Sequence, residues 1–250
     1  MTMKSFLLLS LLLWSVVVSA SAARLEAQET TTGTCSTDKI QACNAELGVV
    51  AEEDLSEQIS AMMGHLRAGL ALFEIAEYGM GAPHLMHPIR ETSEAQKDVL
   101  RNYGFDERAF ETLAESASES SAHAERMAQV LSLISSMESL QSRLSSDPYR
   151  NVSNLLNLAK KEYGIAVAGN AVADISEYQD AYGFILEAKQ QSGLMEADDA
   201  AAVLSLLEAL EALWIDGVEP PAQPTPASTV ARQIAAAIEK LNAIEPDNAR

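Results

Sequence analysis

The chain is short of basic residues, and this shortage narrows the range of its partners. Its 250 residues include 17 Lys and Arg against 36 Asp and Glu, which gives a formal net charge of −19. Nucleic-acid binding depends on Lys and Arg side chains that displace the counterions of phosphate backbones. We therefore expect no nucleic-acid partner. Apolar residues make up 48% of the chain, so its composition is that of a protein with a packed core rather than of a disordered acidic tail.

Motifs of common enzyme classes are also missing. The sequence contains no G-x-S-x-G nucleophile elbow and no G-x-x-x-x-G-K-[ST] phosphate loop. Its few histidines are not flanked by a convincing nucleophile. We therefore expect a protein that is not an enzyme, although a carboxylate site assembled from distant helices would leave no local motif.

Long hydrophobic runs are absent except at the start of the chain. Lys4 is followed by an apolar run of 13 residues, Phe6 to Val18, and then by Ala20-Ser21-Ala22. This order is typical of a secretory signal peptide. The run is shorter than the roughly 20 residues that span a bilayer. We expect residues 1–22 to be cleaved near Ala22, leaving a periplasmic or secreted protein with no transmembrane segment.

Cysteine is scarce, with only Cys35 and Cys43 in the chain. In an oxidising compartment these two residues can form a single disulfide, which is the favoured interpretation. The alternative is a pair of free thiols on one short helix. There the offset of eight residues would separate them by about 12 Å, too far for a bridge.

Strand patterns are missing, and the apolar residues instead recur at steps of three and four. Such a stripe runs from Leu55 to Phe73 and predicts a helix that begins at Asp54 and ends near Gly79. A loop is expected next, because Pro83 and Pro88 oppose regular structure. The pattern as a whole predicts an all-α fold, an up-and-down antiparallel bundle of six to eight helices. Its expected parts are a flexible leader (23–53), the bundle (54–217), a proline-rich linker (218–227) and a C-terminal helix packed on the bundle (228–250).

The four histidines are unevenly placed, which makes them informative. His65, His84 and His87 fall within 23 residues, and His84 and His87 are three apart, so on a helical turn both would project to one side. If the segment after Gly79 folds back along its helix, these histidines can meet. The candidate ligands of a transition metal are His65, His84, His87, Glu77, Met80 and Met86.

The identity of the metal depends on which of these residues join the histidines. A carboxylate such as Glu77 would suit iron, zinc or manganese, whereas methionines such as Met80 and Met86 would favour copper. We expect iron or copper, or a metal-bearing ligand such as haem. The alternative is a buried histidine with a hydrogen-bonded partner and two solvent-exposed histidines that bind no metal. Gly64 and Gly69 flank His65 and indicate close approach of another helix or of a flat ligand.

The segment Lys161 to Leu186, KEYGIAVAGNAVADISEYQDAYGFIL, resembles the extracytoplasmic helical region of bacterial high-affinity iron permeases and of associated periplasmic iron-uptake proteins. The resemblance covers about a tenth of the chain. The matching residues are Glu162, Tyr163, Ala166, Val167, Gly169, Val172, Glu177, Tyr178 and Phe184.

Iron permeases of that family carry an R-E-x-x-E motif in membrane helices, and we expect no such helices here. The resemblance therefore implies an exported helical module that handles a metal for a membrane transporter or another envelope protein. The alternative is a structural or interaction module that docks an envelope partner without a metal. It predicts an exposed apolar patch and histidines that lie far apart.

Overall fold

The computed structural model describes residues 51–116 and 122–244, which belong to one compact unit. The predicted signal peptide, most of the predicted leader and the pair Cys35 and Cys43 lie outside the described residues. Within the described ranges the chain forms nine α-helices and one small β-sheet. The predicted all-α fold class is thus confirmed. None of the described helices is both long enough and apolar enough to cross a membrane.

The first group of helices shares one hydrophobic core, which contains Leu66, Phe73, Phe110 and Ile134. Helix α2 is the longest of the group and packs against α3 and α6. The helices of this group are α2 (Glu52–Glu74), α3 (Tyr78–Glu91), α4 (Glu94–Asn102), α5 (Glu107–Ser116) and α6 (His123–Gln141).

The segment predicted as a loop is helix α3, and the helix before it ends at Glu74 rather than near Gly79. The chain reverses at Ala76, which has a φ of 65°. Pro83 and Pro88 lie inside α3, where each costs about 3 kcal/mol relative to alanine. Packing outweighs this cost, because α3 buries a full face against α2. The residues of that face are Gly81, His84, Leu85, Pro88 and Ile89.

The second group is a four-helix bundle around a separate core that includes Tyr163, Tyr178 and Trp214. Asp147 and Asp174 cap the first two helices by accepting hydrogen bonds from backbone N–H groups. The helices are α7 (Pro148–Ala166), α8 (Ile175–Ser192), α9 (Ala197–Glu211) and α10 (Ala227–Ile244).

A short hairpin connects α7 to α8, where the sequence analysis expected no strand. Strand β1 (Val167–Ala168) pairs antiparallel with β2 (Ala171–Val172). Gly169 in the loop between them has a φ of 64°, which glycine adopts without strain. Gly169 therefore lies in the turn of the hairpin and not at the end of α7.

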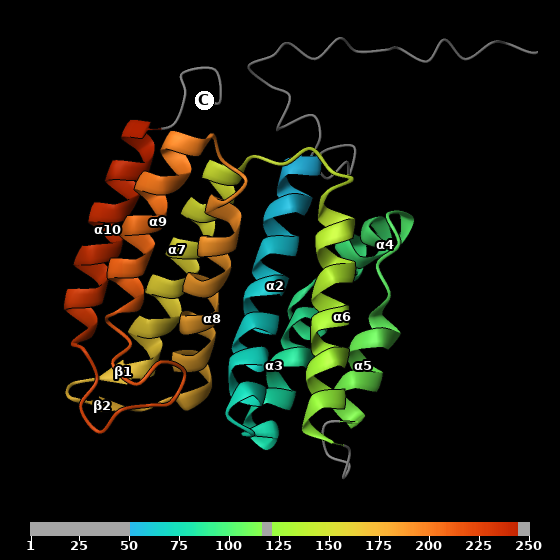
Figure 1. Cartoon of the computed structure of the whole chain (residues 1–250), viewed down its shortest axis with the longest axis horizontal. Coiled ribbons are helices and arrows are strands. Elements are labelled where there is room, and N and C mark those ends of the chain that lie inside the picture. The colour runs from blue at the N-terminus through green and yellow to red at the C-terminus, as the bar shows by residue number, and fades with distance from the viewer. Residues whose placement is uncertain (1–50, 117–121, 245–250) are drawn as a thin grey trace, which may run out of the picture. The chain divides into compact units, whose positions relative to one another are not determined.

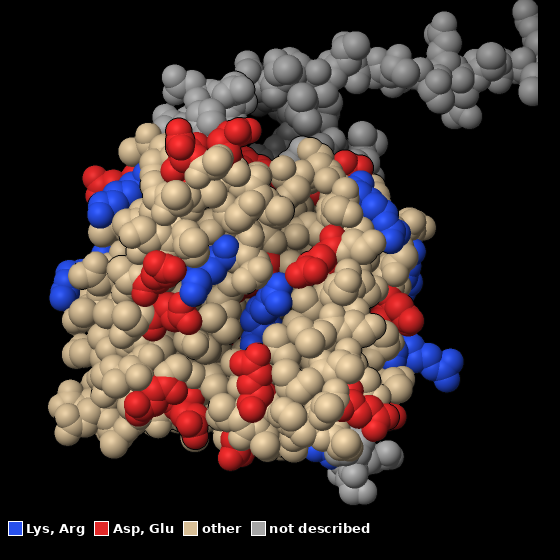
Figure 2. Space-filling model, in the orientation of Figure 1, with Lys and Arg blue, Asp and Glu red and all other residues tan. Residues whose placement is uncertain are grey.

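Helix α2 joins the two groups, because it packs against α8 and α7 as well as against its own neighbours. Figure 1 shows α2 beside α8, with α7, α9 and α10 on one side and α3 to α6 on the other. Acidic side chains are scattered over the face in Figure 2, several with basic side chains beside them. On this face the acidic side chains are therefore partly balanced by basic ones.

A buried carboxylate lies in the interface between α2 and α8. Glu187 is 0% exposed, and its Oε2 atom accepts a hydrogen bond from Arg67 Nε at 3.0 Å. Arg67 also reaches Glu138 on α6, and Gln191 donates to the other oxygen of Glu187. Burial outweighs these favourable contacts and raises the pKa of Glu187 to about 7.

We expect the Glu187→Gln variant to gain stability relative to the parent as the pH rises. The folded parent binds the Glu187 proton more tightly than the unfolded chain does, so ionisation between about pH 4.5 and pH 7 destabilises it. The variant lacks this loss, so its relative free energy of unfolding should rise by roughly 3 kcal/mol across that window. Urea unfolding at pH 4.5 and pH 8 measures the change. Glu208→Gln, at an exposed position of α9, is the control, and an equal pH dependence in both variants would contradict the assignment.

Candidate metal centre

Helices α2 and α8 cross at a pair of glycines. Gly64 and Gly183 approach so closely that a Cβ atom at Gly183 would lie 2.3 Å from the carbonyl oxygen of Gly64. His65 follows Gly64 on α2, and Asp180 lies about one turn before Gly183 on α8. The close approach of another helix that the sequence predicts at Gly64 is confirmed. The crossing brings an imidazole and a carboxylate together inside the protein.

Helix α3 brings two further histidines to this crossing. It folds back along α2, where a Cβ atom at Gly81 would lie 3.1 Å from the carbonyl oxygen of Gly69. His84 and His87 are three residues apart, so both imidazoles project toward α8. The segment after Gly79 thus folds back along α2, as the sequence allows, and it does so as helix α3.

Asp180 is the centre of the arrangement. Its Oδ1 atom lies 2.7 Å from His65 Nδ1 and 2.8 Å from His84 Nδ1, and its Oδ2 atom lies 2.9 Å from His87 Nδ1. Asp180 and His84 are each 1% exposed, and His65 is 5% exposed. One ligand atom from each of the four residues lies within 4.8 Å of the others.

The outer ring nitrogens of two histidines are held by acceptors. His65 Nε2 lies 3.2 Å from Glu91 Oε2, and His84 Nε2 lies 2.9 Å from Gln179 Oε1. A carboxylate or carbonyl oxygen only accepts, so these Nε2 atoms carry hydrogen and donate it. In the neutral imidazole the lone pair is then on Nδ1, which faces Asp180. Lone pairs and carboxylate oxygens that face one another require a positive charge between them.

In the metal-free protein a proton supplies that charge. Burial alone would lower the pKa of His65, but hydrogen bonds to Asp180 and Glu91 outweigh it and raise this pKa to about 9. Burial alone would raise the pKa of Asp180, but the three imidazoles hold it well below its usual range. The site is therefore built around a cation, and a metal ion can take the place of the proton.

Three imidazoles and one carboxylate form a donor set that suits borderline transition metals. The contacts of Glu91 and Gln179 to the outer nitrogens have the form of the carboxylate–histidine and carbonyl–histidine pairs that orient metal ligands. The donor atoms lie close enough together to surround one ion.

The other three predicted ligands lie apart from this cluster. Glu77 is exposed and precedes α3. The sulfur of Met80 lies 3.8 Å from Gln179 Nε2. Met86 faces a different cavity, beside Tyr78. The carboxylates at the histidines are Asp180 and Glu91 instead.

Sequence reasoning did not select Asp180 or Glu91, although each left a signal. Gln179 and Asp180 are adjacent polar residues directly before the largely apolar stretch Ala181 to Leu186 of α8. Glu91 belongs to Arg90-Glu91-Thr92-Ser93-Glu94, which matches R-E-x-x-E letter for letter. This segment spans the junction of α3 and α4, where Glu91 contacts His65 and Glu94 pairs with Lys97. The two glutamates therefore serve different partners.

Fold and site together define an all-helical protein with a buried three-histidine, one-aspartate centre between two helix groups. Residues 141–248 match the family model of the iron permease-associated 4-helix bundle domain, which confirms the resemblance to iron-permease helical regions. The match covers α7 to α10, less than half of the chain, and contains Asp180 but none of the three histidines. No curated protein and no solved structure gave a significant match.

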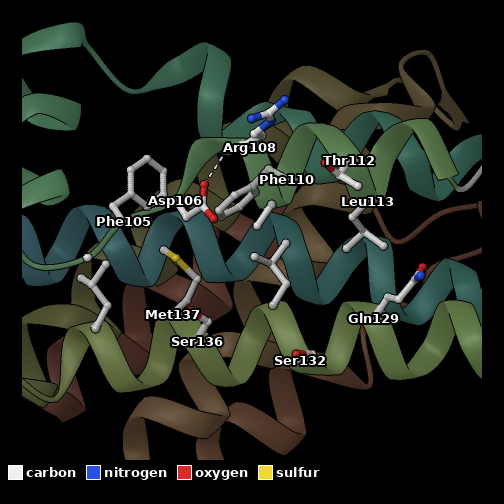
Figure 3. A pocket seen from close by; sticks show the side chains of 14 residues that line it. Phe105, Asp106, Arg108, Phe110, Thr112, Leu113, Gln129, Ser132, Ser136 and Met137 are labelled. Carbon is white, nitrogen blue, oxygen red and sulfur yellow. Dashed lines mark hydrogen bonds between the residues drawn. The ribbon is translucent and has the colours of Figure 1, made fainter.

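A second feature of the described residues is an apolar groove between α5 and α6, with a volume of about 500 Å³. Figure 3 shows Phe105, Phe110 and Met137 gathered along it, with polar residues such as Gln129 at its side. None of the four residues of the histidine centre lines this groove.

Proposed function

We propose that this protein binds one transition-metal ion at His65, His84, His87 and Asp180 and serves as an accessory to iron uptake. The observation that carries the proposal is the convergence of three Nδ1 atoms on one buried carboxylate. The docking alternative requires histidines that lie far apart, so this convergence favours metal binding.

Iron is the metal that the donor set and the family match favour together. The histidines meet a carboxylate rather than methionine sulfur, and a nitrogen and oxygen set suits iron, zinc or manganese better than Cu(I). The matched domain is associated with iron permeases. Donor atoms within 4.8 Å of one another fit a bare ion, not the wide ring of a haem.

An exported protein that delivers or senses iron at a membrane transporter fits these features. Support comes from the signal-like residues 1–22 and from the iron-permease association of residues 141–248. We expect binding rather than catalysis, because each histidine and Asp180 is engaged within the centre.

A metal titration tests this function. The parent protein is expected to bind one equivalent of Fe(II) without oxygen, or of Co(II) as a spectroscopic substitute. His84→Ala/His87→Ala removes two of four ligands and should weaken binding at least 100-fold. Competition against a chromophoric chelator and metal analysis after desalting measure the affinity and the stoichiometry.

His123→Ala is the matched control, because His123 lies on α6 against Tyr78, outside the cluster. This variant should bind like the parent. A parent that binds no metal, or a double variant that keeps stoichiometric metal, would refute the site.

A further inference from the structure

An acidic cleft leads from the surface to the histidine centre. It has a volume of about 570 Å³, and His65 and Glu91 are among its lining residues. The side chain of His65 is 7% exposed, whereas that of Glu91 is 58% exposed. Glu91 thus contacts both the solvent and a buried ligand of the centre.

The lining of the cleft is rich in negative charge. The acidic lining residues come from α2, α3 and α7, and they are Asp54, Glu57, Glu91 and Glu162. Arg150 forms ion pairs with the first two. Lys161 is the basic lining residue, and its Nζ atom lies 2.8 Å from Glu162 Oε1.

Lys161 is surrounded by carboxylates but is not buried. The hydrogen bond to Glu162 and the charges of Glu162, Glu177 and Glu91 raise the pKa of Lys161. Its side chain is 66% exposed, so it can leave the cleft at little cost. A flexible ammonium group in an acidic cleft occupies the position that a metal cation would take on entering the cleft.

We propose that this cleft is the route by which a hydrated divalent cation reaches the centre, with Lys161 as the internal cation that it displaces. The inference rests on the proposed function. Acid-lined clefts raise the local concentration of cations and speed their association. An anionic metal chelate would be repelled, so the cleft selects the free ion as the ligand.

The rate of metal loading tests the route. Stopped-flow mixing with Co(II) at low ionic strength should show that Lys161→Met loads several-fold faster than the parent. Glu162→Gln should load several-fold more slowly, because it removes a negative charge and leaves Lys161 unpaired. In 0.5 M salt these differences should shrink toward zero, because salt screens exposed charges.

Lys160→Met is the matched control. Lys160 is the adjacent residue on the same helix and does not line the cleft, yet its loss changes the net charge equally. It should load at the rate of the parent. The side chain of Lys161 is exposed, so Lys161→Met should leave the packing of the protein unchanged, and equal urea unfolding of this variant and the parent ties faster loading to the lost charge.

The outcomes separate the route from the centre itself. A parent that binds no cobalt refutes the proposed function. A parent that binds cobalt, with Lys161→Met and Lys160→Met loading at equal rates, overturns the route and leaves the centre standing. Loading from the anionic Co(II)–EDTA complex as fast as from free Co(II) also overturns it.

Discussion

Asp180→Asn is expected to abolish tight metal binding and to destabilise the metal-free protein in the same step. The carboxylate of Asp180 lies within hydrogen-bond distance of three imidazole nitrogens and carries a negative charge, whereas the amide of asparagine is neutral. In the variant the positive charge at His65 loses its nearest counter-charge. Loss of a residue that only orients a metal ligand lowers affinity by up to about 100-fold. Asp180 is itself a proposed ligand, so we expect metal affinity to fall by at least about 100-fold.

The stability effect follows from the same contacts. Removing one partner of a buried ion pair leaves an uncompensated charge, which costs about 3 kcal/mol. Urea unfolding of the metal-free parent and variant at pH 7 measures this loss, and cobalt titration measures the affinity. Asp216→Asn, an exposed neutralisation in the segment after α9, controls for the change in net charge. Parent-like cobalt affinity in Asp180→Asn would show that this carboxylate is not a ligand.

The helical fold could be predicted because its signals are local. Apolar spacing marks α2, and Asp147 with Pro148 marks the start of α7, each within a few residues. The helix α3 could not be predicted in this way. Pro83 and Pro88 oppose a helix locally. The segment is nevertheless helical because it buries one face against α2, and this packing cannot be read from the local sequence.

The candidate site likewise contains residues that local sequence signals can identify and residues that only the tertiary packing brings in. His84 and His87 could be paired from their spacing, and His65 could be joined to them by a chain reversal that brings α3 onto α2. Asp180 is 93 residues beyond His87. Nothing near Asp180 in the sequence points to a histidine, because the contact depends on how α8 crosses α2. The segment that resembles the iron-permease region includes Asp180, but Asp180 is not among the matching residues.

Gly183→Ala is expected to lower the stability of the protein by about 3 kcal/mol or more, the upper range for overpacking. The added methyl would lie 2.3 Å from the carbonyl oxygen of Gly64 and 2.8 Å from the backbone nitrogen of Ala68. Both atoms belong to the backbone of α2, so no side chain can turn aside. The helices must separate, and thermal or urea unfolding should report the loss.

The same separation should weaken the metal centre, because His65 and Asp180 face one another across this crossing. Metal binds the folded state, so excess metal should stabilise Gly183→Ala less than it stabilises the parent. Gly164→Ala is the control, since a Cβ atom there meets nothing within 4 Å. In the helix α7 it should raise stability by up to about 1 kcal/mol and leave metal binding unchanged. If Gly183→Ala were as stable and bound metal as tightly as Gly164→Ala, the close crossing of α2 and α8 would be disproved, and with it the reason that His65 meets Asp180.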